Sequence, residues 1–231
     1  MQDKTKKLLL PLLFMVAVCV GFCSCGDKKK NSTSGESEDK AVSTCPDSNH
    51  PHAIDLGLPS GTKWACCNVD ASSPVDYGGY YAWGETKEKS KYNKSTYKYY
   101  DSSTGSVDIG HNIAGTSYDV AHVKWGGSWC MPSLEQTQEL LDKCSGVRVQ
   151  QNGVSGRLFT GPNGNSVFFP AGGFRYNDVL HVDGSYGVYW LSTLNGYSQS
   201  SAYYFYFNSG FAYWNCYHRY YGHMVRPVRR N

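Results

Sequence analysis

The 231-residue sequence has no long hydrophobic run and no large excess of charge. Its longest apolar stretch, residues 8–21, is interrupted by Pro11 and is shorter than the roughly 20 apolar residues of a membrane-spanning helix. With 22 basic and 19 acidic residues, the net charge of +3 leaves no electrostatic footprint for nucleic acid, so we expect no nucleic acid partner. A glycine motif that would cradle phosphate is also missing.

The first residues carry an export signal. Three lysines precede the short apolar stretch, as in a signal peptide that is removed from the mature chain. The stretch ends at Phe22-Cys23-Ser24-Cys25-Gly26, where a small serine directly precedes a cysteine. This pattern resembles that of bacterial lipoproteins. The resemblance implies a signal peptide over residues 1–24 and attachment of palmitate-type acyl chains to Cys25.

The anchor determines where we expect the protein to be found. Several acyl chains, each contributing roughly 0.8 kcal/mol per buried methylene, hold a chain stably on a bilayer. We therefore expect a protein that is lipid-anchored in the bacterial outer membrane and exposed at the cell surface. Residues 26–28 are only a weak guide to the membrane face, and an uncleaved anchor or plain secretion remain the alternatives.

Two further regions follow the signal peptide. Residues 25–52 are the lipidated cysteine and a tether, because residues 26–44 contain almost nothing to bury and such composition favours disorder. Residues 53–231 have the size of one domain.

The cysteines and histidines are candidates for a disulfide bond and for a metal site. Outside the cytoplasm disulfides are permitted, and we expect a bridge from Cys66 or Cys67 to Cys144; buried thiols without a bridge are an equally open alternative. Cys45, His50 and His52 are soft metal ligands. No fourth ligand lies near these three residues at the spacing typical of zinc sites, so we expect no metal.

The domain shows strand patterns and one clear helix. Residues 54–58 and 63–69 are separated by a Pro-Ser-Gly turn and predict a hairpin. Ser133 and Gln136 predict a capping box for a helix over residues 133–144. Six short apolar runs predict strands at 157–160, 166–170, 189–193, 203–208, 211–215 and 224–228. Many strands with one or two helices indicate an α+β fold.

The stretch from residue 185 to 223 is dominated by aromatic residues. It contains ten tyrosines among Ser, Asn and Gly, and no Asp, Glu or Lys. Because a buried tyrosine hydroxyl needs a hydrogen-bond partner, we expect most of these rings to lie at the surface. Antibody binding sites use the same residue types, since tyrosine offers a large contact area at low entropic cost. A tyrosine-rich face without a ligand is an equally open interpretation.

Three segments resemble a known family. Residues 54–86, 121–133 and 220–228 are similar, in order, to the Fibrobacter succinogenes major paralogous domain, and the resemblance extends over nearly all of residues 53–230. It implies a C-type-lectin-like fold of the kind found in formylglycine-generating enzymes. It also implies that the C-terminal segment corresponds, in some members, to the variable region of diversity-generating retroelement targets.

In such targets the variable residues project from a fixed scaffold onto one face, where they contact a ligand. In strand 203–208, Tyr204 and Tyr206 should point outward, while Phe205 and Phe207 point inward. The residues that we expect to bind ligand are Tyr189, Leu191, Thr193, Tyr197, Ser198, Tyr204, Tyr206, Phe211, Tyr213, Cys216, Tyr217, His218, Tyr220, Tyr221 and His223.

The sequence gives little support for oxidase activity, calcium binding or acid–base catalysis. Oxidase relatives carry active cysteines late in the fold, where this chain has only Cys216. Calcium-binding lectins follow Trp-Asn with an acid, whereas Cys216 follows Trp214-Asn215 here, and hard cations require several carboxylates. His218 and His223 have no carboxylate or nucleophile placed beside them for acid–base work. We therefore expect no enzyme, no metal and no cofactor.

Two functions remain open for such a chain. The first is a receptor or adhesin, a monomer that binds an unidentified protein or glycan through its tyrosine-rich face. The alternative is a structural envelope or fimbria-associated subunit that uses the same face for assembly. A large exposed aromatic patch favours either over an enzyme.

Overall fold

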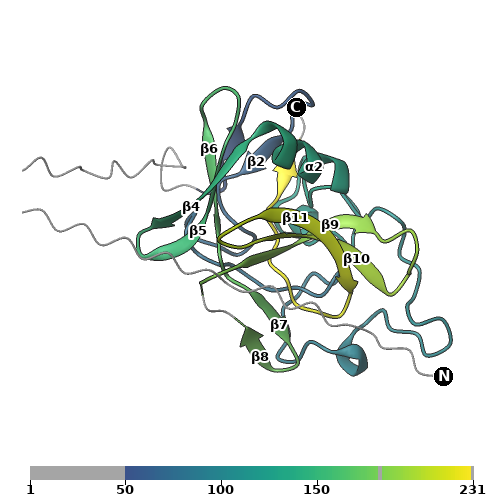
Figure 1. The fold of residues 1–231 in the computed structure, drawn as a ribbon. Coiled ribbons are helices and arrows are strands. Elements are labelled where there is room, and N and C mark those ends of the chain that lie inside the picture. Colours follow the sequence, from purple (N-terminus) through teal and green to yellow (C-terminus); the bar gives the residue numbers. More distant parts are fainter. Residues whose placement is uncertain (1–49, 182–183, 230–231) are drawn as a thin grey trace, which may run out of the picture. The chain divides into compact units, whose positions relative to one another are not determined.

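The computed structural model describes residues 50–181 and 184–229, and the elements of this part of the chain are shown in Figure 1. The expected signal peptide, the acylation site Cys25 and nearly all of the expected tether lie outside the described residues. None of the helices within them is both long and apolar enough to cross a membrane. Within these residues, short antiparallel strands and two α-helices make up the domain, which confirms the predicted α+β class.

The strands form three small sheets and a hairpin, in which every strand pair is antiparallel. The first sheet has the order β1 (Ala53–Asp55), β2 (Lys63–Ala65), β12 (Val228–Arg229) and β3 (Trp129–Cys130). The second has the order β11 (Ala212–His218), β10 (Ser201–Phe207) and β9 (Gly187–Leu194). The third consists of β4 (Ser145–Gln151), β5 (Val154–Thr160) and β6 (Ser166–Pro170), and the hairpin of β7 (Phe174–Tyr176) and β8 (Val179–His181).

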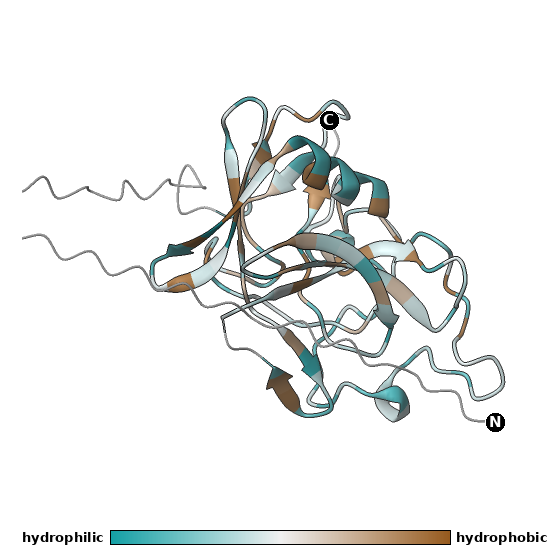
Figure 2. Ribbon diagram, viewed as in Figure 1, coloured by the Kyte–Doolittle hydropathy of each residue, from teal (hydrophilic) through white to brown (hydrophobic). Residues whose placement is uncertain are grey.

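The predicted helix is present as α2 (Leu134–Lys143). Its capping box forms as expected: the Gln136 N–H donates to Ser133 Oγ over 3.2 Å, and the Ser133 N–H donates to Gln136 Oε1 over 2.9 Å. Hydrophobic and hydrophilic bands alternate along this helix (Figure 2), as expected for a helix with one buried side. A second helix, α1 (Val120–Trp125), and a 3₁₀ turn, η1 (Lys94–Thr96), were not predicted.

Most strand predictions are confirmed. The expected hairpin is β1 paired with β2, and β5, β6, β9, β10 and β11 lie where apolar runs indicated them. The strand expected at 224–228 is wrong in extent. Where the segment begins, the chain makes only isolated bridges, from His223 to Tyr81 and from Met224 to Tyr189. Only Val228, the last residue of the expected strand, belongs to a strand, β12.

The core is built largely from aromatic rings. Phe169 lies at its centre and makes edge-to-face contacts with Trp64, Phe159, Tyr189 and Phe205, at centroid distances of 5.6, 5.5, 5.3 and 5.6 Å. The expectation that most rings of the 185–223 segment lie at the surface is therefore wrong for several of them. Buried tyrosines are accommodated because backbone carbonyls accept their hydroxyl protons, as Pro170 does from Tyr189 over 2.6 Å.

The expected disulfide to Cys144 is contradicted. Cys144 is a free thiol at the C-terminal end of α2, where it packs against the main core. Cys66 and Cys67 pack in a different cluster, beside Ile54, Ala71 and Trp125. The fold therefore places the two partners of the expected bridge in separate parts of the domain.

Candidate functional site: an aromatic pocket

The candidate site is a pocket of about 260 Å³ beside the β11-β10-β9 sheet. We call it the aromatic pocket. Its lining comes from β7, from the three strands of the sheet, from the residue before β9 and from the segment after β11. The lining residues are Phe174, Tyr186, Val188, Tyr204, Tyr206, Tyr217, Tyr221 and His223.

Strand β10 supplies the centre of the pocket by alternation. Phe205 and Phe207 are 1% and 2% exposed and enter the core, while Tyr204 and Tyr206 point to the opposite side and line the pocket. This confirms the outward and inward assignment made from the sequence. The antiparallel register then sets Val188 of β9 opposite Tyr206 and brings Tyr217 of β11 to the same side of the sheet.

Ring stacking holds the segment after β11 against the pocket. Tyr221 stacks on Tyr176 at a centroid distance of 4.6 Å, with the two planes inclined by 9°. Tyr217 meets Tyr221 edge to face at 4.7 Å, and Tyr186 stacks on Tyr206 at 6.0 Å. Because each ring supports the next, the pocket has a defined shape before any ligand arrives.

His223 is the most deeply buried residue of the lining, at 2% exposure. Burial lowers the pKa of its imidazole to about 3, so the ring is neutral at physiological pH. Its Nδ1 atom has no hydrogen-bond partner among the described residues. The ring therefore acts as an uncharged aromatic surface in the floor of the pocket, which argues against a general-base role at neutral pH.

The pocket is apolar and electrically neutral. Its lining contains no Asp, Glu, Lys or Arg among the described residues. Burial raises the pKa of Tyr204 to about 12, and burial together with Tyr217 raises the pKa of Tyr221. The phenols remain protonated and can donate hydrogen bonds at the edge of an apolar cavity. This combination suits the recognition of uncharged groups.

Two further predicted residues extend the pocket into an aromatic ridge, which we define as Phe211 and Tyr213. Phe211 is 55% exposed and lies 5.7 Å from Tyr213, which in turn lies 5.1 Å from Tyr206 between ring centroids. Tyr213 is also the direct cross-strand partner of Tyr206. The pocket and the ridge together form one continuous aromatic surface.

The remaining exposed predictions lie apart from the pocket. Tyr197, at 98% exposure, and Ser198 lie in the turn between β9 and β10. His218 and Tyr220 stack at 5.1 Å and line a different hollow of about 310 Å³. Cys216 is half-buried, and its sulfur accepts a hydrogen bond from Asn195 over 3.2 Å.

Three predicted contact residues are corrected to scaffold. Tyr189, Leu191 and Thr193 are only 1%, 1% and 7% exposed, because every residue of β9 is buried. The physical reason is that β9 is covered on both sides of the sheet, so the side chains that point to either side are buried. The Thr193 hydroxyl accepts from the Leu134 N–H at 3.1 Å and so secures the start of α2.

Sequence reasoning missed some of the lining. Phe174, Tyr186 and Val188 line the pocket although none was predicted to bind ligand. Pairing β9 with β10 in the antiparallel register identifies Val188, whereas Phe174 arrives through the β7–β8 hairpin, which left no recognisable pattern. Trp214 of β11 is 37% exposed, and its Nε1 donates to Gln138 of α2 over 2.6 Å.

Comparison with known proteins gives one match. Residues 150–228 match a family described as a domain of unknown function (DUF8237). The match covers less than half of the chain, yet it includes every residue that lines the aromatic pocket. No curated protein and no solved structure matches the chain.

Proposed function

We propose that this protein is a cell-envelope lipoprotein that binds a ligand through the aromatic pocket and the aromatic ridge, as a receptor or adhesin. One observation carries the proposal. Five of the residues predicted from sequence to contact ligand converge on one neutral pocket: Tyr204, Tyr206, Tyr217, Tyr221 and His223. Aromatic residues that did not share a binding function would not be expected to line the same pocket.

The lining indicates the kind of ligand. A pocket of about 260 Å³ accepts a single side chain or one sugar ring rather than a whole cofactor. The ligand is a protein with an exposed apolar or aromatic side chain, or a glycan that presents the apolar side of a ring. Phenol hydroxyls at the edge would then bind its polar groups, as tyrosines do in antibody binding sites.

The composition of the lining also supports binding over catalysis. Within the described part of the chain, the pocket is lined by aromatic residues, one valine and one histidine, with no carboxylate, thiol or aliphatic hydroxyl. Since His223 is neutral and buried, a proton-transfer role has no partner group there. A non-enzymatic protein without a cofactor fits this surface best.

The resemblance to the Fibrobacter succinogenes major paralogous domain is part of the same proposal. A C-type-lectin-like scaffold would hold the strands β9, β10 and β11 fixed while the outward residues of β10 and β11 vary. The pocket and the ridge are built largely from such outward residues, which suits a diversified binding face. The lipid anchor at Cys25 would hold this face outside the outer membrane, and a Cys25→Ser chain should leave the membrane fraction and lose acyl labelling.

A screen tests the binding function. The full chain is probed with immobilised glycans and with a displayed peptide library, and every hit is tested again on the Tyr206→Ala/Tyr217→Ala double variant. We expect hits that bind the unaltered chain and fail on the variant. Hits that bind both proteins equally would place recognition elsewhere and would remove the basis of the proposal.

One observation favours assembly as a second candidate function. Strand β11 lies at the edge of its sheet, and five of its seven residues are exposed. Exposed edge strands pair readily with other chains. A structural envelope or fimbria-associated subunit would self-associate at micromolar concentration in analytical ultracentrifugation and would lose this association in a Tyr213→Lys variant, whereas a receptor would sediment as a monomer.

A further inference from the structure

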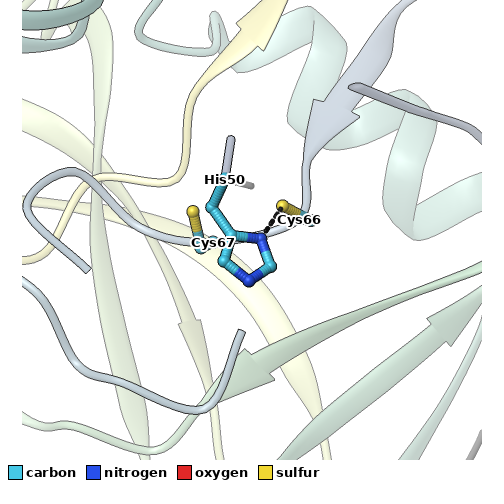
Figure 3. Close-up of side chains that lie close together, drawn as sticks. All are labelled: His50, Cys66 and Cys67. Carbon is cyan, nitrogen blue, oxygen red and sulfur yellow. Dashed lines mark hydrogen bonds between the residues drawn. The ribbon is translucent and has the colours of Figure 1, made fainter. Parts of the chain in front are cut away.

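A cluster of sulfur and nitrogen ligands lies where the described part of the chain begins. One ligand atom each from His50, Cys66 and Cys67 lies within 4.8 Å of the other two. Figure 3 shows the His50 ring directed toward the two cysteines. His50 Nδ1 is 3.3 Å from the Cys66 sulfur, and His52 Nδ1 is 3.9 Å from the same sulfur.

The backbone explains how neighbouring cysteines reach one side. In a strand, adjacent side chains point in opposite directions. Strand β2 ends at Ala65, and Cys66 and Cys67 form a bend, so both sulfurs approach the imidazole. The Cys66 N–H donates to the His52 carbonyl over 2.9 Å, which fixes the histidine segment beside the bend.

A buried positive charge lies beside the two cysteines. Cys66 and Cys67 are fully buried, where uncompensated negative charge would be costly. The buried Arg226 guanidinium donates from Nη1 to the carbonyls of Ala65 and Cys66 over 3.0 and 2.8 Å, which brings a positive charge to the same bend. A divalent cation between two thiolates would balance the remaining charge.

We propose that His50, Cys66 and Cys67 bind a zinc ion, with His52 as the fourth ligand. Two sulfur and two imidazole ligands in a tetrahedral arrangement are typical of zinc. Ligand atoms around such an ion lie about 3.3–3.8 Å apart, given the usual zinc–sulfur and zinc–nitrogen distances. The His50–Cys66 pair is already at this separation, and the Cys67 sulfur, within 4.8 Å of both atoms, reaches it by closing about 1 Å. His52 Nδ1, 3.9 Å from the Cys66 sulfur, is also close to this separation.

The ion would act as a structural cross-link. Binding releases one proton from each thiol and involves no change of oxidation state. It joins the residues before β1 to the bend after β2, at the point where the chain enters the domain. Sequence spacing hides such a site, because His-Pro-His and an adjacent Cys-Cys pair do not match the usual zinc patterns. The site also lies outside the region matched by the domain family.

Metal content and thermal unfolding test the site. The full chain is purified in detergent, reduced, freed of metal by chelation and then titrated with Zn²⁺ alone. We expect one zinc ion per chain by mass spectrometry and a rise in Tm of about 5–10 °C at saturating metal. The His50→Gln/His52→Gln variant should lose both. These histidines are partly exposed, so the variant should still fold.

Matched controls and a spectroscopic measurement complete the experiment. His111→Gln, at an exposed position, and Cys144→Ser, at the free thiol of α2, should behave as the unaltered chain. Co²⁺ in place of Zn²⁺ should give a sulfur-to-metal charge-transfer band that weakens in Cys66→Ser and Cys67→Ser. Full zinc content and an unchanged Tm rise in the double histidine variant would overturn the proposal, as would a disulfide at either cysteine. Neither result bears on the aromatic pocket, since no ligand is measured.

Discussion

The imidazole of His223 stacks on the indole of Trp190, with ring centroids 3.9 Å apart and planes inclined by 27°. This contact fixes the segment after β11 to the buried strand β9. The backbone of His223 also exchanges two hydrogen bonds with Tyr81, of 3.0 and 2.9 Å. The floor of the aromatic pocket is therefore part of the core, while its walls are surface residues of β10 and β11.

The burial of His223 predicts a specific pH dependence. Its pKa is about 3 in the folded chain and about 6.5 in the unfolded chain, so the unfolded state binds the additional proton. The associated stability is complete above about pH 6.5 and is lost as the pH falls toward 3. The loss reaches up to about 3 kcal/mol at pH 4. Urea unfolding across this range should show it in the unaltered chain and not in His223→Phe.

The phenylalanine in this variant keeps the stack on Trp190 and removes only the titrating nitrogens. The facing groups Tyr204 and Tyr221 do not titrate in this range, because the pKa of each is raised above that of an ordinary phenol. An identical dependence of stability on pH in both proteins would show that the ring is protonated in the folded state, contrary to its burial.

The substitution Tyr189→Phe should show whether Tyr189 contributes to stability or to ligand binding. The substitution removes the hydrogen bond from the hydroxyl to the Pro170 carbonyl, at a cost of about 1 kcal/mol in the free energy of unfolding. Ligand affinity should remain unchanged because the residue is only 1% exposed. Calorimetric titration with a ligand from the screen checks this, and a marked loss of affinity with unchanged stability would return Tyr189 to the binding face.

Much of the fold follows from local sequence signals. The capping box of α2 and the β1–β2 hairpin rest on residues close together in the chain, and both predictions are confirmed. Strand β4 was not predicted because it has only two apolar side chains, Val147 and Val149, and none of its residues is buried. The segment 224–228 was assigned to a strand because it is rich in apolar residues, but Met224, Val225 and Val228 are apolar because they are buried in the core.

The pocket-lining residues of β10 were predicted from sequence because alternation was visible there. In β10 the paired Tyr and Phe residues distinguish outward from inward positions, as for Tyr204 and Phe205. In β9 that distinction is lost because both sides are buried, so Tyr189 was misassigned. The cysteine–histidine cluster was missed for another reason: it joins residues on either side of a hairpin, and only the fold shows that the bend after β2 meets His50.

Asp119 holds together the loops around the start of α1. Its carboxylate is fully buried and accepts four backbone N–H groups, from Gly115, Ala121, His122 and Met131, over 2.9–3.1 Å. Asp119→Ala would leave these donors without an acceptor and should cost about 4 kcal/mol. Denaturant unfolding measures this cost. A loss below about 1 kcal/mol would mean that water replaces the carboxylate.

The diversification proposal predicts where variation falls. If an error-prone copy of a template rewrites this segment, codons for outward residues such as Tyr206, Tyr213 and Tyr217 should differ among clones. Codons for Phe205 and Phe207 should stay constant. Sequencing the locus in a cultured population tests this, together with a search for a near-copy of the codons for residues 185–223 beside a reverse-transcriptase gene. An invariant segment without template or transcriptase would contradict diversification and would leave the pocket itself unaffected.

The central claim is that the aromatic pocket binds the ligand, and calorimetric titration of the strongest ligand from the screen tests it most directly. The titration compares the Tyr206→Ala/Tyr217→Ala variant with Trp214→Ala, which removes a ring from the opposite side of the same strand, β11. The account predicts a Kd at least about tenfold weaker for the pocket variant, as for a hot spot, and a change of less than about threefold for Trp214→Ala. Equal losses in both variants, or a loss confined to Trp214→Ala, would contradict it.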